Sequence, residues 1–228
     1  MTSRDALALI EVDVISCRAC PRLVEWRERV ARDKRAAFAG ETYWGRPVPG
    51  FGDPHARVFI VGLAPAAHGG NRTGRIFTGD RSGDWLFASL HRCGFASQPT
   101  SVRRDDGLSL DNAYVAAAVR CAPPANKPAP EERDRCQTYL EREMEALPEV
   151  RCVVALGAYA WDSALRVHAA LGGPRPRPKP RFGHGAEADL GDYLLLGSFH
   201  PSQQNTFTGR LTEEMLDAVF LRAAQLAL

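Results

Sequence analysis

The sequence predicts an α/β protein, a three-layer α/β/α sandwich around a central four-stranded parallel sheet. Four short apolar runs alternate along the chain with segments that have helical patterns and capping residues. The runs are almost continuously apolar, which is typical of strands buried on both faces. Alternating strands and helices favour parallel strands joined by right-handed crossovers, and such sheets bind ligands beyond the carboxyl ends of their strands.

The apolar runs and capping residues place each expected element. The strands are residues 57–63 (RVFIVGL), 113–119 (AYVAAAV), 151–156 (RCVVAL) and 193–198 (YLLLGS). Helices are expected over residues 82–93, 131–147 and 159–171, and from Thr212 to the C-terminus. Ser82 and Thr212 are the expected N-caps of the first and last of these helices. Before the sheet, Pro21 begins a helix that runs to about Arg35, and residues 43–52 form an irregular, aromatic-lined loop.

Composition indicates one domain. The chain has 228 residues, of which 45% are hydrophobic, and no change in composition marks a second domain. We therefore expect a single domain over residues 1–228. No run of about 18 apolar residues occurs. The N-terminal segment carries acidic residues, so we expect neither a membrane span nor a signal peptide, and a cytoplasmic protein.

Charge alone does not identify a partner, because the net charge is only +2. The cations are unevenly placed, however. Residues 173–181 (GPRPRPKPR) form a proline-rich arm with four cations and no acid. Such an arm suits a polyanion backbone, and it is equally typical of a solvated surface loop.

The loop after the first strand, residues 62–80 (GLAPAAHGGNRTGRIFTGD), has the glycine spacing of a phosphate-binding P-loop. A P-loop continues with Lys and then Ser or Thr, which bind phosphate and Mg²⁺. Arg75 and Ile76 occupy these positions, so the motif does not predict a nucleotidase. Unusual loops also follow the other three strands, and all four are expected at one edge of the sheet. Their convergence predicts a functional site there.

Four of the six cysteines have the context of metal ligands. They are a Cys-x-x-Cys pair before the first helix, one thiol at the end of the second strand and one on the next helix: Cys17, Cys20, Cys121 and Cys136. Four thiolates can hold either Zn²⁺ or a 4Fe-4S cluster, and the spacing does not choose between them. Cys93 and Cys152 lie in an amphipathic helix and an apolar strand, where we expect core thiols.

These motifs together resemble the type B, family 5 uracil-DNA glycosylases of bacteria, in the iron-sulfur branch of that superfamily. The resemblance spans nearly the whole chain and rests on CRACPRL, RPVPGFGD, GLAPAAHGGNRTGRIFTGD, VRCAPPANKPAP and SFHPSQQNTFTGRLT. It implies a structural 4Fe-4S cluster on Cys17, Cys20, Cys121 and Cys136, with a cluster-binding segment over about residues 1–52. It also implies a monomeric base excision repair enzyme that acts on double-stranded DNA in the nucleoid and leaves an abasic site.

The chemistry of base excision assigns roles to residues in these loops. A glycosylase must flip the nucleotide into a pocket, and Phe77 is the expected stacking face. The departing base becomes anionic and the sugar cationic, so donors are needed for the base. His200 can donate to a base carbonyl, and Asn126 can donate to the base or orient the water. Asp80 can polarise the water or support the cationic sugar, or it can simply cap the following helix.

Other residues of the same loops are expected to bind the substrate. We expect Gly62, Ala64 and His68 to shape the pocket, although a loop histidine is often only solvated. Polar residues on the rim are expected to contact phosphates, and Gln203 and Gln204 to enter the duplex with Asn205 as a wedge. The rim set consists of Asn71, Arg72, Arg75, Ser202, Asn205 and Arg210.

The chain departs from better-known branches of the superfamily in two ways. The segment Gly62-Leu63-Ala64-Pro65 has no acidic residue, and alanines stand where an asparagine enforces pyrimidine recognition. Family 5 enzymes accept hypoxanthine and xanthine as well as uracil, which fits a less selective pocket. The alternatives are a non-catalytic iron-sulfur protein that binds nucleic acid and a small-molecule hydrolase. The second lacks the Gly-x-Ser-x-Gly nucleophile motif.

Overall fold

A mixed six-stranded sheet forms the centre of the molecule, in a computed structural model that describes residues 1–228. The strand order is β1-β3-β2-β4-β6-β5. The four inner strands run parallel and are the four that the sequence predicts, so the parallel part of the sandwich is confirmed. The strands are β1 (Phe51–Gly52), β2 (Val58–Gly62), β3 (Ala113–Ala117), β4 (Cys152–Leu156), β5 (Glu187–Asp189) and β6 (Leu194–Ser198).

The two edge strands are missing from the prediction. β1 pairs antiparallel with β3, and β5 pairs antiparallel with β6. They are two and three residues long, which is too short to show a strand-like alternation of apolar and polar residues. The sheet is therefore six-stranded and mixed, rather than four-stranded and purely parallel.

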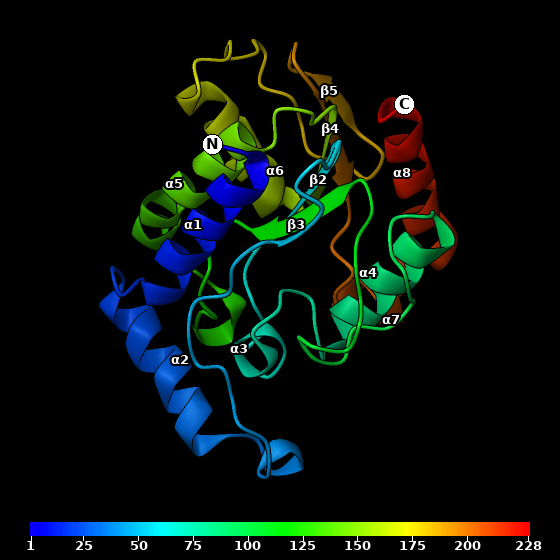
Figure 1. The fold of residues 1–228 in the computed structure, drawn as a ribbon. Helices are drawn as coiled ribbons and strands as arrows, with labels where there is room; N and C mark the ends of the chain where they lie inside the picture. The colour runs from blue at the N-terminus through cyan, green and yellow to red at the C-terminus, as the bar shows by residue number, and fades with distance from the viewer.

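Alternate side chains of β2 point to opposite faces of the sheet, and helices cover each face. All five residues of this strand are buried. Val58 and Ile60 belong to a core of 25 buried residues that includes side chains of α4 and α8. Phe59 and Val61 belong to a second core of 19 residues that includes side chains of α5 and α6. Helices thus cover both faces of the sheet (Figure 1), and the predicted three-layer sandwich is confirmed.

The five predicted helices are present, with ends that differ by a few residues. The unpredicted α1 begins with a capping box between Thr2 and Asp5 and packs against α5. No helix has the length and apolarity that crossing a membrane requires. The helices are α1 (Ser3–Ser16), α2 (Pro21–Asp33), α3 (Gly70–Thr73), α4 (Arg81–Arg92), α5 (Pro130–Ala146), α6 (Ala158–Ala170), α7 (Gln203–Phe207) and α8 (Glu213–Leu226), with 3-10 turns η1 (Ala36–Phe38) and η2 (Pro124–Asn126).

Candidate active site

Four loops leave the same edge of the sheet. They follow β2, β3, β4 and β6, which run parallel, so each begins at a carboxyl end. Figure 1 shows the single-turn helices α3 and α7 beyond this edge, below the sheet in that view. The convergence that the sequence predicts is confirmed.

Phe77 and His200 come into contact at this edge. Their ring centroids lie 5.8 Å apart, with an angle of 35° between the ring planes. The tip of the Phe77 ring lies over Gly62, where any side-chain carbon would overlap it. Phe77 has a φ of 50°, a left-handed conformation that is strained for a bulky residue. It is also 6% exposed and belongs to the first core, so its ring serves both the core and the site.

His200 follows β6 and has an uncharged ring at neutral pH. Burial lowers the pKa of His200 to about 4. The Asn205 side chain donates a hydrogen bond of 2.8 Å to the His200 carbonyl oxygen, which ties this residue to α7. A side-chain carbon at Gly157, directly after β4, would be in van der Waals contact with the His200 Cβ. A neutral imidazole carries one N–H donor, so His200 can donate to a ligand without carrying charge.

Asp80 is the N-cap of α4. This confirms the capping alternative for Asp80, and the N-cap predicted at Ser82 is wrong. Its Oδ1 accepts a hydrogen bond of 3.0 Å from the Gly83 N–H. The other carboxylate oxygen lies against Gly69, where a side chain would overlap it. Burial raises the pKa of Asp80, although backbone N–H groups of the cap partly offset this effect. The cap uses Oδ1, and Oδ2 accepts none of the other side-chain hydrogen bonds of the structure.

Asn71 and Arg72 are buried, and placing them on an exposed rim was wrong. Asn71 is fully buried in α3, and its Nδ2 donates to the Arg27 carbonyl oxygen at 3.2 Å. The Arg72 guanidinium donates to the Glu41 carboxylate at 2.5 Å and to the Gly79 carbonyl oxygen at 2.9 Å. Both side chains therefore brace the loop of residues 62–80 from inside.

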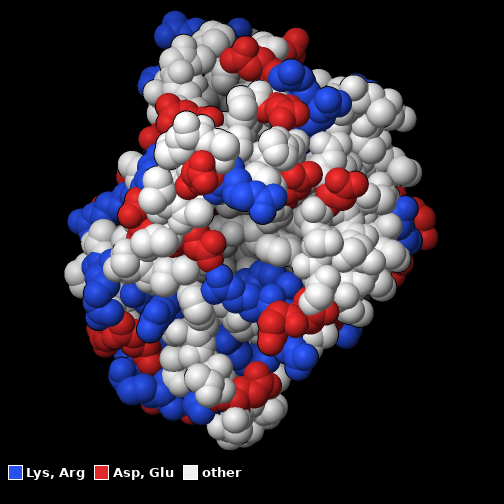
Figure 2. Space-filling model, in the orientation of Figure 1, with Lys and Arg blue, Asp and Glu red and all other residues white.

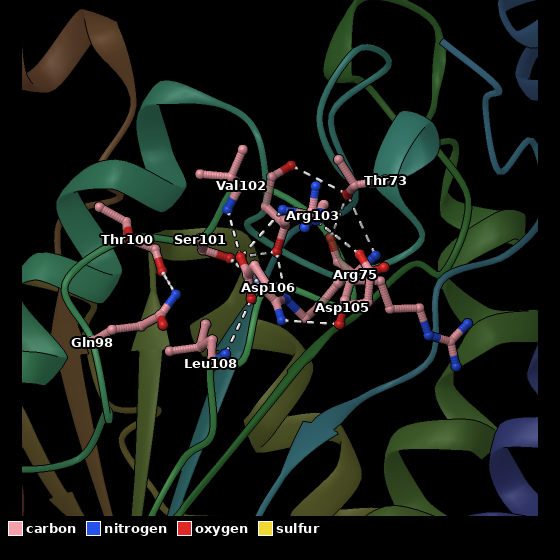
Figure 3. Close-up of polar contacts among 12 residues, drawn as sticks. Thr73, Arg75, Gln98, Thr100, Ser101, Val102, Arg103, Asp105, Asp106 and Leu108 are labelled. Carbon is pink, nitrogen blue, oxygen red and sulfur yellow. Dashed lines mark hydrogen bonds and ion pairs between the residues drawn. The ribbon is translucent and has the colours of Figure 1, made fainter.

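Arg75 is a third internal brace, again in contrast to the predicted rim. It is 3% exposed and donates to both oxygens of Asp106, at 2.8 and 2.7 Å, and to Ser101 Oγ at 2.8 Å. These contacts join the loop after β2 to residues 101–108 (Figure 3). Burial alone would raise the pKa of Asp106, but Arg75 and three backbone N–H groups outweigh it and lower the pKa to about 2.

Replacing Asp106 with Asn should lower the free energy of unfolding at pH 7 by about 3 kcal/mol, because it leaves the Arg75 guanidinium buried without its charge partner. The depressed pKa of Asp106 stabilises the fold at pH values above the unfolded value of 3.8, and this contribution is lost as pH falls towards about 2. Urea denaturation at pH 7 and at pH 3 measures both effects. The difference between the two proteins should be smaller at pH 3.

Asp105 offers the matched control for this variant. Its side chain is 84% exposed and pairs with Arg103 at 3.1 Å on the surface. Exposed ion pairs contribute about 0–1 kcal/mol, so Asp105→Asn should leave the unfolding free energy nearly unchanged. Equal losses for the two variants would show that the buried pair is not the brace of this loop.

The other pocket candidates have different neighbours. His68 Nδ1 is 3.0 Å from the Tyr43 hydroxyl, and burial lowers its pKa. Ala64 packs against the buried cysteines. Asn126 is exposed at the end of η2 with a φ of 56°. The strands that precede Asn126 and His200 are β3 and β6, and β2 and β4 lie between them in the sheet.

Helix α7 forms the predicted wedge segment, as a single turn rather than a loop. Ser202 is its N-cap, and its hydroxyl makes no capping hydrogen bond. Phe207 at the end of α7 is 68% exposed and is the only aromatic side chain among the large exposed hydrophobic residues. The Arg81 guanidinium lies 5.8 Å from the Phe207 ring, and Arg210 lies 4.5 Å from the Phe199 ring.

Arg81 and Phe207 are two further candidate site residues, which the sequence analysis did not predict. An arginine directly after Asp80, and an aromatic residue in the polar stretch QQNTFTGR, were the available signals. Both residues are exposed on the edge that carries His200.

The basic arm lies along the outer surface of α6, away from the meeting point of the loops. Lys179 pairs with Asp162 at 2.7 Å, and Trp161 Nε1 donates to the Pro180 carbonyl oxygen at 3.2 Å. Figure 2 shows Lys and Arg mixed with Asp and Glu over the visible face, without a continuous basic band. On this face, contacts with a polyanion would come from local groups of cations.

The four candidate cysteines lie together between α2, α5 and the loop after β3. Cys20, Cys121 and Cys136 share a small buried core with Leu23 and Val119. Burial raises the pKa of the Cys121 thiol to about 12 and of the Cys136 thiol to about 11, and the negative charge of Cys17 adds to both. We call these four residues the cysteine group. Cys93 and Cys152 lie elsewhere, in the two positions predicted for core thiols.

Comparison with known proteins identifies the class that this fold and site define. Residues 49–223 match the family model for the Uracil DNA glycosylase superfamily. The chain belongs to the uracil-DNA glycosylase superfamily. It is 56% identical over 222 residues to the type-5 uracil-DNA glycosylase of Mycobacterium tuberculosis (strain CDC 1551 / Oshkosh), covering 96% of this chain and 80% of that one. Within the superfamily it is a type-5 uracil-DNA glycosylase.

Two further relatives show that sequence identity is higher to a type-5 enzyme than to a type-4 enzyme. Identity to the type-5 enzyme of Thermus thermophilus is 55% over 213 residues, which is 93% of this chain and 94% of the relative. Identity to the type-4 enzyme of Thermotoga maritima is 34% over 161 residues, 70% and 66% of the two chains. The family resemblance drawn from the motifs is confirmed. The chain is an enzyme of base excision repair that acts on DNA, and this replaces the non-catalytic alternative.

Proposed function

We propose that this single-domain, monomeric glycosylase flips deaminated nucleotides out of double-stranded DNA and excises uracil, hypoxanthine and xanthine, leaving an abasic site. The observation that carries the broad substrate range is the end of β3. Ala116, Ala117 and Ala118 are buried there and offer no side-chain amide that could enforce pyrimidine recognition. A pocket defined by shape rather than by hydrogen bonds should admit purines as well.

The experiment is to incubate the purified enzyme with duplexes that contain one uracil, hypoxanthine or xanthine and then cleave abasic sites with alkali. Strand cleavage is expected for all three bases and not for an undamaged duplex. Cleavage of the uracil duplex alone would contradict the broad range and leave the family activity intact. Cleavage before alkali would contradict a simple hydrolase.

In the proposed reaction, water attacks the sugar carbon C1′ while the N-glycosidic bond breaks and its electrons leave with the base. The neutral His200 ring donates a hydrogen bond to the departing base, whose negative charge grows in the transition state. Asp80 acts on the sugar and the water instead of the base. Its Oδ2 faces the cationic sugar and takes a proton from the attacking water. Phe77 stacks with the flipped base, and Gly62 leaves room for its ring.

The remaining candidates support these three residues. Asn205 orients His200 through the His200 carbonyl oxygen. Asn71 and Arg72 hold the loop of residues 62–80 in place, with His68 and Ala64 on its inner side. Asn126 is exposed at another strand end, where it can reach the substrate when DNA binds. Ser202, with an unused hydroxyl at the start of α7, is placed for a phosphate.

The proposed cofactor is a 4Fe-4S cluster on Cys17, Cys20, Cys121 and Cys136. The residues fit this group, because the donors would be four thiols, and three of them share one small buried core. When bound, the cluster cross-links α2, α5 and the loop after β3. Excision needs no electron transfer, so its role is structural.

DNA contacts are proposed at Arg81, Phe207 and Arg210, beside His200. Replacing both Arg81 and Arg210 with Gln should reduce the slope of log affinity against log salt by about 2, because each phosphate contact contributes roughly 0.9. Fluorescence anisotropy over a salt series with a uracil-free duplex measures the slope.

The matched control replaces Arg175 and Arg177, which are exposed on the arm along α6. It removes the same charge, so an effect of net charge alone would appear in both double variants. If the slope is unchanged for the Arg81 and Arg210 variant but reduced for the arm variant, the DNA interface lies on the arm along α6 and not beside His200.

A further inference from the structure

Arg27 is a buried cation without a carboxylate partner. Four arginines are 9% exposed or less. Three of them pair with acids: Arg72 with Glu41, Arg75 with Asp106 and Arg120 with Glu143. Arg27, at 2% exposed, makes no ion pair with any carboxylate and leaves its buried Nε without a partner. Burying an unpaired charge is strongly unfavourable, so this guanidinium requires an anion nearby.

The groups that the Arg27 guanidinium contacts belong to the cysteine group. One terminal nitrogen donates to Cys121 Sγ at 2.8 Å, and the other donates to the Cys17 carbonyl oxygen at 3.1 Å. Cys17 and Cys121 come from segments that are about a hundred residues apart in the chain. Arg27 therefore bridges the two halves of the group. A thiolate bound to a metal would supply the counter-charge that no carboxylate supplies.

The backbone of Arg27 contacts the loop of residues 62–80, which carries Phe77. Its carbonyl oxygen accepts the hydrogen bond from Asn71 Nδ2, and Asn71 is fully buried in α3. Helix α3 lies in the same loop as Phe77, and Ala64 of that loop packs against the buried cysteines. One residue on α2 thus touches both the thiols and the loop that carries Phe77.

We infer that Arg27 is a positioning residue that balances the negative charge of the thiolate-bound cluster and ties the cluster to the loop of residues 62–80. This inference rests on the proposed 4Fe-4S cofactor. Hydrogen bonds to the sulfurs and nearby charge tune such clusters. Removing the guanidinium should weaken retention of the cluster, and removing the Asn71 link should loosen the loop while the cluster stays.

The test compares Arg27→Met, Arg27→Lys and Arg22→Met with the unmodified protein. Decay of the visible absorption after addition of EDTA and ferricyanide, with iron and sulfide analysis, measures cluster loss. Arg27→Met should lose the cluster at least about tenfold faster, from one lost charged hydrogen bond. The rate of cluster loss in Arg27→Lys should lie between those of Arg27→Met and the unmodified protein, because lysine keeps the positive charge but lacks the guanidinium that donates two hydrogen bonds. Arg22→Met breaks the nearby ion pair with Glu132 and no bond to sulfur, so it should decay at the original rate.

Asn71→Ala tests the second half of the link. Hydrogen exchange of the amides of residues 66–74 should accelerate in Asn71→Ala, which keeps its iron, whereas Arg27→Met keeps the backbone carbonyl that Asn71 contacts and loses iron quickly. An iron-containing protein in which Arg27→Met decays at the original rate would overturn the inference and leave the cofactor standing. Protein that purifies with one zinc and no iron would overturn the cofactor itself, and the inference with it. If Arg27→Met does not fold, Arg27→Lys decaying at the original rate is the contradicting result.

Discussion

Replacing His200 with alanine should slow excision of uracil about 100-fold in single turnover, as for the loss of one preorganised donor to a developing oxyanion. The effect should fall on the chemical step, because charge on the base develops only in the transition state. DNA affinity should barely change. Rapid quenching at saturating enzyme separates the chemical step from binding. A fully active His200→Ala enzyme would remove this residue from catalysis.

The pKa of His200 adds a distinctive pH profile. Burial lowers this pKa to about 4, so the ring stays neutral through the range in which an exposed histidine would titrate. Excision should therefore show no His200 step near pH 6.5. In the unfolded chain the ring binds a proton at about pH 6.5, so stability should decrease as pH falls from there to about 4.

Asp80→Asn tests whether Asp80 acts through its negative charge on the cationic sugar or only as a helix cap. Asn is as good an N-cap as Asp, and its amide oxygen can still accept from the Gly83 N–H. The variant should keep its melting temperature and lose excision rate, because the negative charge that favours the cationic sugar is gone. Full excision rate with an unchanged melting temperature would make Asp80 a cap and nothing more.

Replacing Cys121 with alanine should abolish the 4Fe-4S cluster and destabilise the fold. Metal-site binding energy contributes directly to folding, and Cys121 lies where α2, α5 and the loop after β3 meet. The brown colour of aerobically purified protein should disappear. With about 2–4 °C per kcal/mol for a chain of this size, the melting temperature should fall by roughly 10 °C or more. Iron, zinc and sulfide analysis with thermal unfolding measures both effects.

Cys93→Ala and Cys152→Ala are the matched controls, because both remove a thiol outside the cysteine group. Cys93 is partly exposed at the end of α4, and Cys152 is buried in β4. Both variants should keep their full iron content. Cys152→Ala should also lose some stability through the space left in the core. Loss of iron from either control would show that the ligand set is different.

The sequence predicts the fold wherever a pattern is long enough to be seen. The four inner strands are unbroken apolar runs, and five helices carry caps or periodic apolar residues. β1 and β5 are too short to show a period. The single turns α3 and α7 fix no more than a few residues each, so no helical repeat marks them in the sequence.

The site is less predictable than the fold, because the direction of a side chain depends on distant contacts. Asn71 and Arg72 are polar residues in a glycine-rich loop, which favours exposure. They are buried only because Arg27 and Glu41, thirty or more residues earlier in the chain, receive their hydrogen bonds. His200 directly follows β6, where parallel topology dictates its position, whereas Phe77 is far along the loop after β2 and its ring reaches Gly62 only because of the path of that loop.

The buried Arg75–Asp106 pair has a consequence for behaviour on heating. The cost of removing charges from water falls as temperature rises, whereas the stabilisation from apolar burial levels off. The loop that carries Phe77 is held to residues 101–108 by this ion pair. The ion pair therefore contributes a larger share of the stability of this loop at high temperature, relative to the apolar core, than it does at about 25 °C.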